Sequence, residues 1–106
     1  MYNSNFTQHY TNDRNKRKYF IDNVIGRGKP LETFYWDRGH RDGPEIHQIT
    51  TTGIEEVYNA WTNKHITDLI ARPQQIDRLY KMEGRSAPAW LLKKAEEHQK
   101  LGYNNL

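Results

Sequence analysis

The chain has 106 residues, of which 35% are hydrophobic, and its mean hydropathy is −1.07, so it can form one small domain with a small core. Cys is absent, which excludes a disulfide scaffold, thiolate zinc sites and a cysteine nucleophile and favours a cytoplasmic location. The net charge of +3 is compatible with a nucleic-acid partner. Because no long apolar run or signal peptide is present, no membrane association is expected.

The N-terminal segment is polar and basic. Residues 1–18 are rich in Asn, Thr, Gln and Arg and have no hydrophobic period, which predicts a flexible, disordered arm before a single domain of residues 19–106. The arm ends in a basic run that can contact phosphates or can simply be solvated, formed by Arg14, Lys16, Arg17 and Lys18. The apolar spacing in Tyr19–Ile25 then predicts a short helix.

The middle of the chain has the pattern of an antiparallel sheet. Short β-prone runs separated by turn residues predict strands at Thr33–Asp37, Glu45–Thr51, Ile54–Tyr58 and His65–Ala71. The last run carries apolar residues on both faces, which favours a central strand. Arg38–Pro44 contains two Gly and one Pro among charged residues, so it is expected to be an irregular loop.

Two helices are expected after the sheet. Ile76, Leu79 and Tyr80 follow the i, i+3, i+4 spacing of an amphipathic helix over Gln74–Met82. Ser86 is the expected N-cap of the last helix and Gly102 its C-cap. Its expected buried stripe comprises Leu91, Leu92, Ala95 and Leu101. The elements together predict an α+β fold in which helices flank a three- or four-stranded antiparallel sheet.

Several enzyme classes lack their motifs in this chain. The sequence contains no GxxxxGK[ST] phosphate loop, no GxGxxG, no GxSxG and no HExxH. His40 and His47 lack the fixed helical spacing of a strong metal site, so neither a metal nor a cofactor is expected.

A metal-independent ribonuclease site is the sharpest hypothesis that the residues allow. Such cleavage needs a base for the 2′-hydroxyl, an acid for the leaving 5′-oxygen and cations beside the phosphorane. Strand alternation places Glu45 on the face of His47, where a carboxylate raises the histidine pKa, so these two would form the acid–base pair. Arg72 and Arg78 would hold the phosphate, although surface histidines and an Arg72–Asp68 ion pair are ordinary structural alternatives.

Further residues are candidates for contacting a nucleic acid or a protein partner. They are the basic run of the arm, the loop residues Arg38, His40 and Arg41, and Trp61 and Lys64 in the connection 59–64. A Trp at a hairpin tip has little core to enter, so Trp61 is expected to stack or to join an interface. Trp36 and Trp90 are expected in the core. Surplus aromatics also leave a homodimer open.

The segments EIHQIT, GIEEVYNAWTNKHIT and DLIARPQQIDRLY resemble short proteins of Gram-positive phages and mobile elements. Their layout is similar to the small ribonuclease superfamily of barnase, colicin-type tRNA nucleases and RelE-type mRNA interferases. The resemblance implies a four-stranded antiparallel sheet with flanking helices and RNA as the partner. It places His47, Thr51, Arg72 and Arg78 by analogy only.

Two functions therefore stay open. The first is a nucleic-acid-binding phage-type protein that can act as a metal-independent endoribonuclease. The second is a non-enzymatic phage inhibitor of a host defence nuclease, similar to anti-CRISPR proteins, which acts by binding a host protein in the bacterial cytoplasm. The inhibitor needs no active site, and its contacts would come from Trp61, the loop Arg38–Gly43 and the basic arm.

Overall fold

The computed structural model describes residues 14–106 and has the predicted α+β architecture. Residues 14–20 are α-helical and continue into a π-helical turn, η1 (Ile21–Ile25). The remaining elements are β1 (Pro30–Trp36), β2 (Glu45–Thr50), β3 (Ile54–Asn59), β4 (His65–Ile70), α2 (Pro73–Met82), α3 (Ala89–Lys100) and the 3-10 turn η2 (Tyr103–Asn105).

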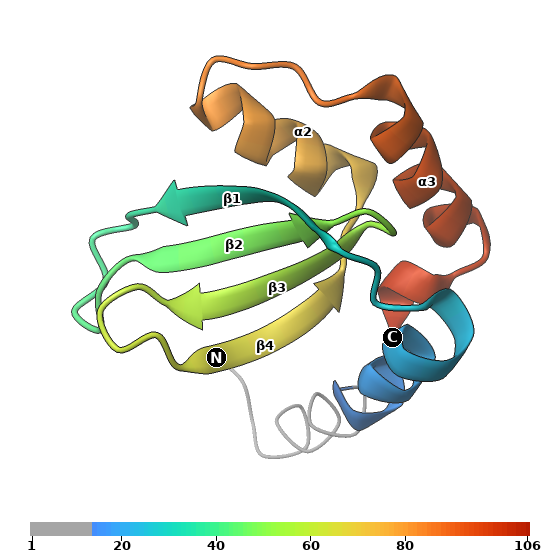
Figure 1. Cartoon of the computed structure of the whole chain (residues 1–106), viewed down its shortest axis with the longest axis horizontal. Helices are drawn as coiled ribbons and strands as arrows, with labels where there is room; N and C mark the ends of the chain where they lie inside the picture. Colours follow the sequence, from blue (N-terminus) through green and yellow to red (C-terminus); the bar gives the residue numbers. More distant parts are fainter. Residues whose placement is uncertain (1–13) are drawn as a thin grey trace.

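The sheet is an antiparallel meander in the order β1-β2-β3-β4 (Figure 1). The β1–β2 and β3–β4 loops leave the sheet at the end remote from the helices, which we call the distal end (Figure 1). The two loops are joined there by hydrogen bonds from Asn59 Nδ2 to Asp42 O at 2.8 Å and from Ala60 N to Pro44 O at 2.9 Å. The loop-rich end of the sheet is therefore held as one unit.

The strand β4 lies at an edge of the sheet, so the prediction of a central position was wrong. Ile70 at its end is covered by residues of the first helix and of the C-terminal turn, whereas Ile66 is exposed. Arg17 Nε donates to Asp68 O at 2.7 Å, and Asn104 Nδ2 donates to the carbonyls of Ile70 and Ala71 at 2.9 Å each. These side chains satisfy carbonyls that an edge strand would otherwise leave exposed.

The first helix begins earlier than the sequence predicted. The last part of the expected arm, from Arg14 to Lys18, is helical, while residues 1–13 lie outside the described part of the chain. Arg17 is 5% exposed, because its guanidinium bonds to β4 and to Leu106 O. The expectation that Arg17 contacts phosphate is thus wrong, whereas Arg14, Lys16 and Lys18 are exposed.

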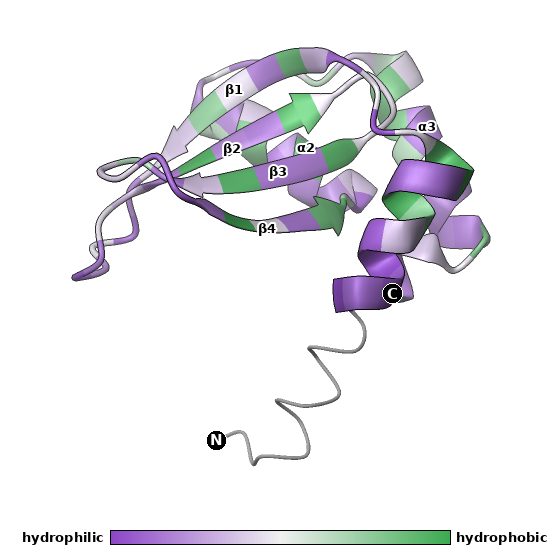
Figure 2. Cartoon of the chain, turned by 60° about the horizontal axis from the view of Figure 1, so that its bottom comes forward, coloured by the Kyte–Doolittle hydropathy of each residue, from purple (hydrophilic) through white to green (hydrophobic). Residues whose placement is uncertain are grey.

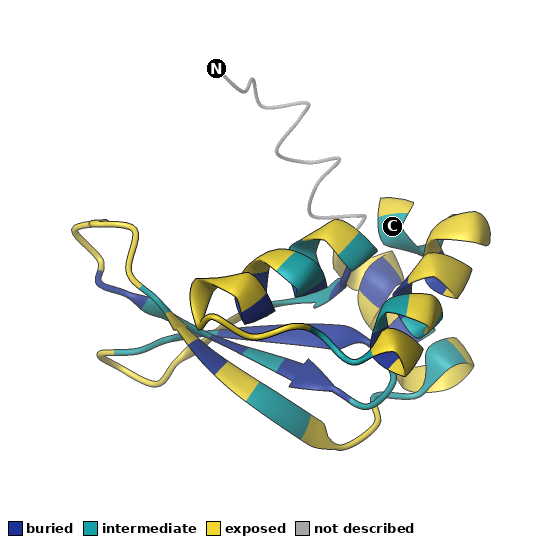
Figure 3. Cartoon of the chain, turned by 90° about the horizontal axis from the view of Figure 1, so that it is seen from above, coloured by how far each residue is buried: buried dark blue, intermediate teal, exposed yellow. Residues whose placement is uncertain are grey.

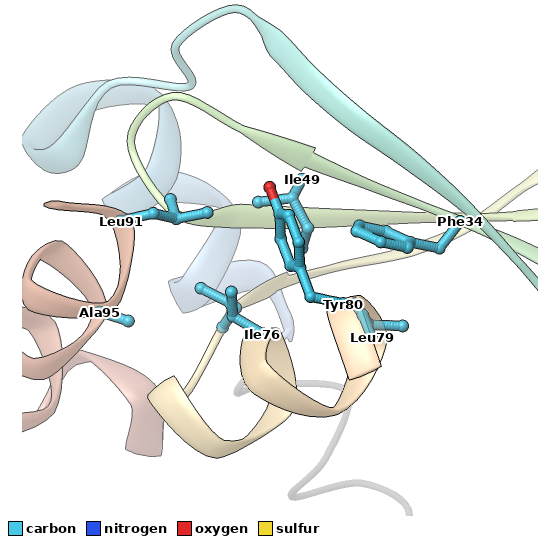
Figure 4. Packing of buried hydrophobic residues seen from close by; sticks show 8 residues of the cluster. Phe34, Ile49, Ile76, Leu79, Tyr80, Leu91 and Ala95 are labelled. Atoms are coloured by element: carbon cyan, nitrogen blue, oxygen red, sulfur yellow. The ribbon is translucent and has the colours of Figure 1, made fainter. Parts of the chain in front are cut away.

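The main core lies between one face of the sheet and the helices α2 and α3 (Figure 4). The predicted stripe of α2, which is Ile76, Leu79 and Tyr80, packs there against Phe34 and Ile49 from the strands. A smaller cluster of Ile21, Ile54 and Ile70 holds the first helix. Figure 3 shows that buried residues concentrate near the helices and that the distal loops are exposed.

The last helix differs in detail from the prediction. It begins at Ala89 with Pro88 as its N-cap, so Ser86 lies outside it. Leu91 and Ala95 are buried as expected, and His98 continues their stripe, but Leu101 is the C-cap residue and is 64% exposed. Trp90 is exposed on the outer face of the helix, and Trp36 is half-buried against the core. Gly102, which was predicted to be the C-cap, is the next residue after Leu101 and has the left-handed conformation.

We expect Leu91→Ala to lower the free energy of unfolding by about 2–5 kcal/mol, because it leaves a cavity in the main core. The matched variant Leu101→Ala on the same helix should change it by less than about 0.5 kcal/mol, since that side chain is exposed. Urea denaturation measures both values. Equal losses in the two variants would contradict the placement of this core.

Candidate functional site

His47 lies in the middle of the sheet with a carboxylate at each ring nitrogen. Its Nε2 is 2.8 Å from Glu45 Oε1, and its Nδ1 is 2.5 Å from Glu55 Oε2. Glu45 shares its face of β2, as alternation predicted. Glu55 was not predicted to take part. It comes from β3, where the register pairs His47 with Val57, so that Glu55 lies two residues farther along the same face. We call these three residues the Glu–His–Glu chain.

The hydrogen bonds of this chain require two protons, because both ring nitrogens face carboxylate oxygens. A histidine that donates from both nitrogens is an imidazolium. Burial is the largest single effect and lowers the pKa of His47, but the hydrogen bonds and charges of Glu55 and Glu45 together outweigh it. The pKa of His47 is therefore raised, as the sequence predicted.

The imidazole itself is closed off from solvent. His47 is 3% exposed, and the ring of Trp36 lies 5.0 Å from it. Two guanidinium groups lie against Trp36 in turn, with the Cζ of Arg38 at 4.0 Å and that of Arg78 at 5.5 Å from the ring. In this arrangement His47 does not reach a substrate. It holds the carboxylate of Glu45, whose side chain is partly exposed.

Glu45 opens onto a cavity of about 570 Å³ at the distal end of the sheet. This distal cavity brings together three of the predicted site residues, namely Glu45, His40 and Lys64. It also contains His65, to which the sequence gave little weight. His65 Nε2 bonds to Asp68 Oδ1 at 2.7 Å, and its ring lies 5.4 Å from that of Tyr58. A register shift after Val57 brings Tyr58 opposite His65. The shift arises only when β3 and β4 pair, so the sequence alone did not predict this contact.

Arg72 and Arg78 lie apart from the distal cavity. Both are exposed, Arg72 as the N-cap residue of α2 and Arg78 within the helix, and they line a second hollow of about 340 Å³ with Gln74 and Gln75. The Nη2 of Arg72 donates to Asn105 Oδ1 at 3.3 Å. Asp68, the partner considered for Arg72, bonds to Arg27 at 3.0 Å. Of the two arginines, Arg78 is nearer to His47, through the ring of Trp36.

Trp61 is 69% exposed on the β3–β4 loop, in agreement with the expectation that it has no core to enter. One side of the indole lies on Gly43, where an added Cβ would be only 2.5 Å from a ring atom. Gly43 also has φ +100, which side chains rarely adopt. Glycine thus lets the distal loops pack together while the outer side of Trp61 faces solvent. Arg41 is exposed in the β1–β2 loop.

The face of the sheet opposite α2 carries a feature that the sequence analysis missed. The cross-strand register aligns Tyr35, Ile46, Tyr58 and His65 in one row. Figure 2 shows α2 behind the sheet, while no element of residues 14–106 covers the distal half of the front face. Strand alternation in the sequence indicates which residues share a face within one strand. The row itself could not be predicted, because it depends on the register of all four strands.

No protein-family model, curated protein or solved structure matches this chain. Within residues 14–106, no group of three or more acidic, His or Cys residues is placed to hold a metal ion. None of the helices in that range has the length and apolar character needed to span a bilayer.

We expect stability to fall as the pH rises through the raised pKa of His47. The hydrogen bonds of the imidazolium contribute stability that is fully present below about pH 6.5 and is lost above the folded-state pKa. The loss should approach about 1.4 kcal/mol per pH unit. Urea denaturation between about pH 5 and pH 9 measures it. In His47→Gln this dependence should disappear, and an unchanged pH dependence in that variant would refute the assignment.

Proposed function

We propose that the protein binds RNA at the distal cavity and cleaves it without a metal ion. The observation that supports this most directly is the placement of Glu45. Its carboxylate is held from behind by a buried imidazolium and lines a cavity that also contains His40, Lys64 and His65. These are the residue types that 2′-hydroxyl attack needs, gathered at the end of the sheet where the loops leave room for a ligand.

The proposed reaction begins at the carboxylate of Glu45. This carboxylate removes the proton of a ribose 2′-hydroxyl, and the oxygen attacks the adjacent phosphorus. The bond from phosphorus to the 5′-oxygen breaks, and that oxygen takes a proton from His65, which acts as the general acid. The products are a 2′,3′-cyclic phosphate and a 5′-hydroxyl. Lys64 stabilises the charge on the phosphorane. His47 acts as a positioning residue, because it touches Glu45 but no reacting atom.

The surrounding groups support binding of a nucleic acid. Arg38 and Arg41 are exposed in the β1–β2 loop, which also supplies His40 to the cavity, so they can contact phosphates. The free side of Trp61 offers a surface on which a base can stack. The coarser form of the proposal, a nucleic-acid-binding protein, rests on these residues and does not require cleavage.

A second candidate function is supported by the exposed apolar side chains at the same end. Tyr35, Trp61 and Ile66 are all exposed there, and such residues are enriched where proteins bind other proteins. A phage-type inhibitor of a host defence nuclease would use this surface without an active site. It would neither bind nor cleave RNA.

The test is incubation of the purified protein with labelled single-stranded RNA in the presence of EDTA. Wild type should give products that end in 2′,3′-cyclic phosphate, and Glu45→Gln should lower the rate about 10²-fold or more. Glu97→Gln, the same change on the exposed side of α3, is the control and should leave the rate unchanged. His47→Gln should lower the rate and alter its pH profile, because Glu45 loses its cationic partner.

The other outcomes separate the alternatives. RNA binding that weakens in Lys64→Ala, without cleavage, would refute catalysis and retain the nucleic-acid-binding protein. Absence of both binding and cleavage would refute the proposal and leave the protein-directed inhibitor. Cleavage at the wild-type rate in Glu45→Gln would show that another group is the base.

A further inference from the structure

We propose that a second site, at the opposite end of the sheet from the distal loops, binds a nucleotide whose base carries an exocyclic amino group. The site is centred on a cavity of about 320 Å³, which we call the proximal cavity. Its lining includes Glu55, Leu69, Ala71, Arg72, Gln75 and Asn104. A volume of this size lies at the lower end of the range of small-molecule pockets.

Two buried oxygens of this lining lack a hydrogen-bond partner. Buried polar atoms in proteins are nearly always paired. Within residues 14–106, three buried side-chain atoms have no partner, and two of them, Glu55 Oε1 and Asn104 Oδ1, belong to residues of the proximal cavity. Glu55 is 1% exposed, so this carboxylate oxygen is not satisfied by bulk water. The concentration of unsatisfied acceptors beside one cavity indicates a ligand that donates hydrogen bonds.

The surrounding contacts fix both groups as acceptors. Glu55 Oε2 is occupied by His47 and by Gln75 Nε2, which donates at 2.9 Å, so Oε1 is the oxygen left over. Asn104 donates both Nδ2 hydrogens to the carbonyls of Ile70 and Ala71. If this side-chain amide were flipped, its oxygen would face the two carbonyl oxygens, which cannot donate a hydrogen bond. The orientation is therefore fixed, and Oδ1 can only accept a hydrogen bond from a further group. The missing partner therefore supplies hydrogen-bond donors, and a base amino group offers two N–H donors on one atom.

The adjoining hollow favours an anion. It shares Arg72 and Gln75 with the proximal cavity and adds Gln74 and Arg78. The N-terminus of α2 lies here, with no side-chain cap and no acidic residue in its first turn. Pro73 has no N–H, and the amides of Gln75 and Ile76 donate to Arg72 O, so the positive end of the helix dipole, the N–H of Gln74 and the two arginines together attract a phosphate. Arg72 and Arg78 thus keep the phosphate-binding role expected from the sequence, at a place other than the distal cavity.

A nucleotide with an amino-bearing base meets both requirements in one molecule. The neutral amino group donates to the unsatisfied oxygens, and the phosphate binds between the arginines. A simple ammonium ion fits less well, because Arg17 and Arg72 also line the cavity. Leu69 and Ala71 give the flat base an apolar wall. Gln75 lines both hollows, and its amide already donates to Glu55 Oε2. Binding here is independent of cleavage at the distal cavity.

The experiment is calorimetric titration of the full chain with adenosine 5′-monophosphate, purine riboside 5′-monophosphate, which lacks the amino group, and inorganic phosphate. The adenine nucleotide should bind about tenfold more tightly than purine riboside monophosphate, or better, the equivalent of about 1.4 kcal/mol. Arg72→Ala with Arg78→Ala should weaken adenosine monophosphate binding about tenfold or more. Lys81→Ala, an exposed charge on the same helix, is the control and should have no effect.

Three results would overturn the site: no binding of adenosine monophosphate at millimolar concentration, equal affinity for the two purine nucleotides, or binding that is unchanged by loss of both arginines. The comparison of ligands does not depend on whether a Glu55 variant folds. Where Glu55→Gln does fold, the preference for the amino group should shrink. Nucleotide binding without RNA cleavage would support this site and count against the proposed function, and the converse result would do the opposite.

Discussion

The buried imidazole of His47, held by a carboxylate at each nitrogen, is the interaction on which the rest of the molecule depends. Removing the two buried groups, His47 and Glu55, from water costs several kcal/mol per charge, and short hydrogen bonds only partly offset that cost. A core of Ile or Leu at these positions would be as stable or more so. The arrangement is therefore better explained by what it positions, since Glu45 reaches the distal cavity and Glu55 reaches the proximal cavity.

This placement links the two ends of the sheet. A hydrogen bond to Glu55 Oε1 withdraws charge from the carboxylate that supports His47, which in turn changes how strongly the imidazolium is bonded to Glu45. The Glu–His–Glu chain thus connects the linings of the two cavities by hydrogen bonds, although the cavities lie at opposite ends of β2 and β3.

Much of the fold could be predicted from local patterns. Alternation in EIHQIT set the faces of β2, and Gly and Pro marked the turns. What could not be predicted depends on contacts distant in sequence. Ile70 of β4 is covered by distant segments, and Arg17 and Asn104 bond to the carbonyls at this edge, so the sequence pattern of an edge strand resembled that of a central one. Glu55 joined His47 only through the β2–β3 register, and the sequence EE alone does not show which glutamate faces which side.

These two neighbouring glutamates provide the strongest internal comparison. Both are buried on β3, on opposite faces of the sheet. Glu56 is fully paired, because Gln48 donates to its Oε1 and Arg27 to its Oε2, each at 2.9 Å. Its role is structural, since the same arginine also bonds to Asp22 and Asp68. Glu55 keeps one oxygen without a partner beside a cavity. Selection for a stable sheet alone would favour full pairing of the carboxylate oxygens at both Glu55 and Glu56. A ligand that donates to Glu55 Oε1 therefore explains why this oxygen has no partner within the described residues.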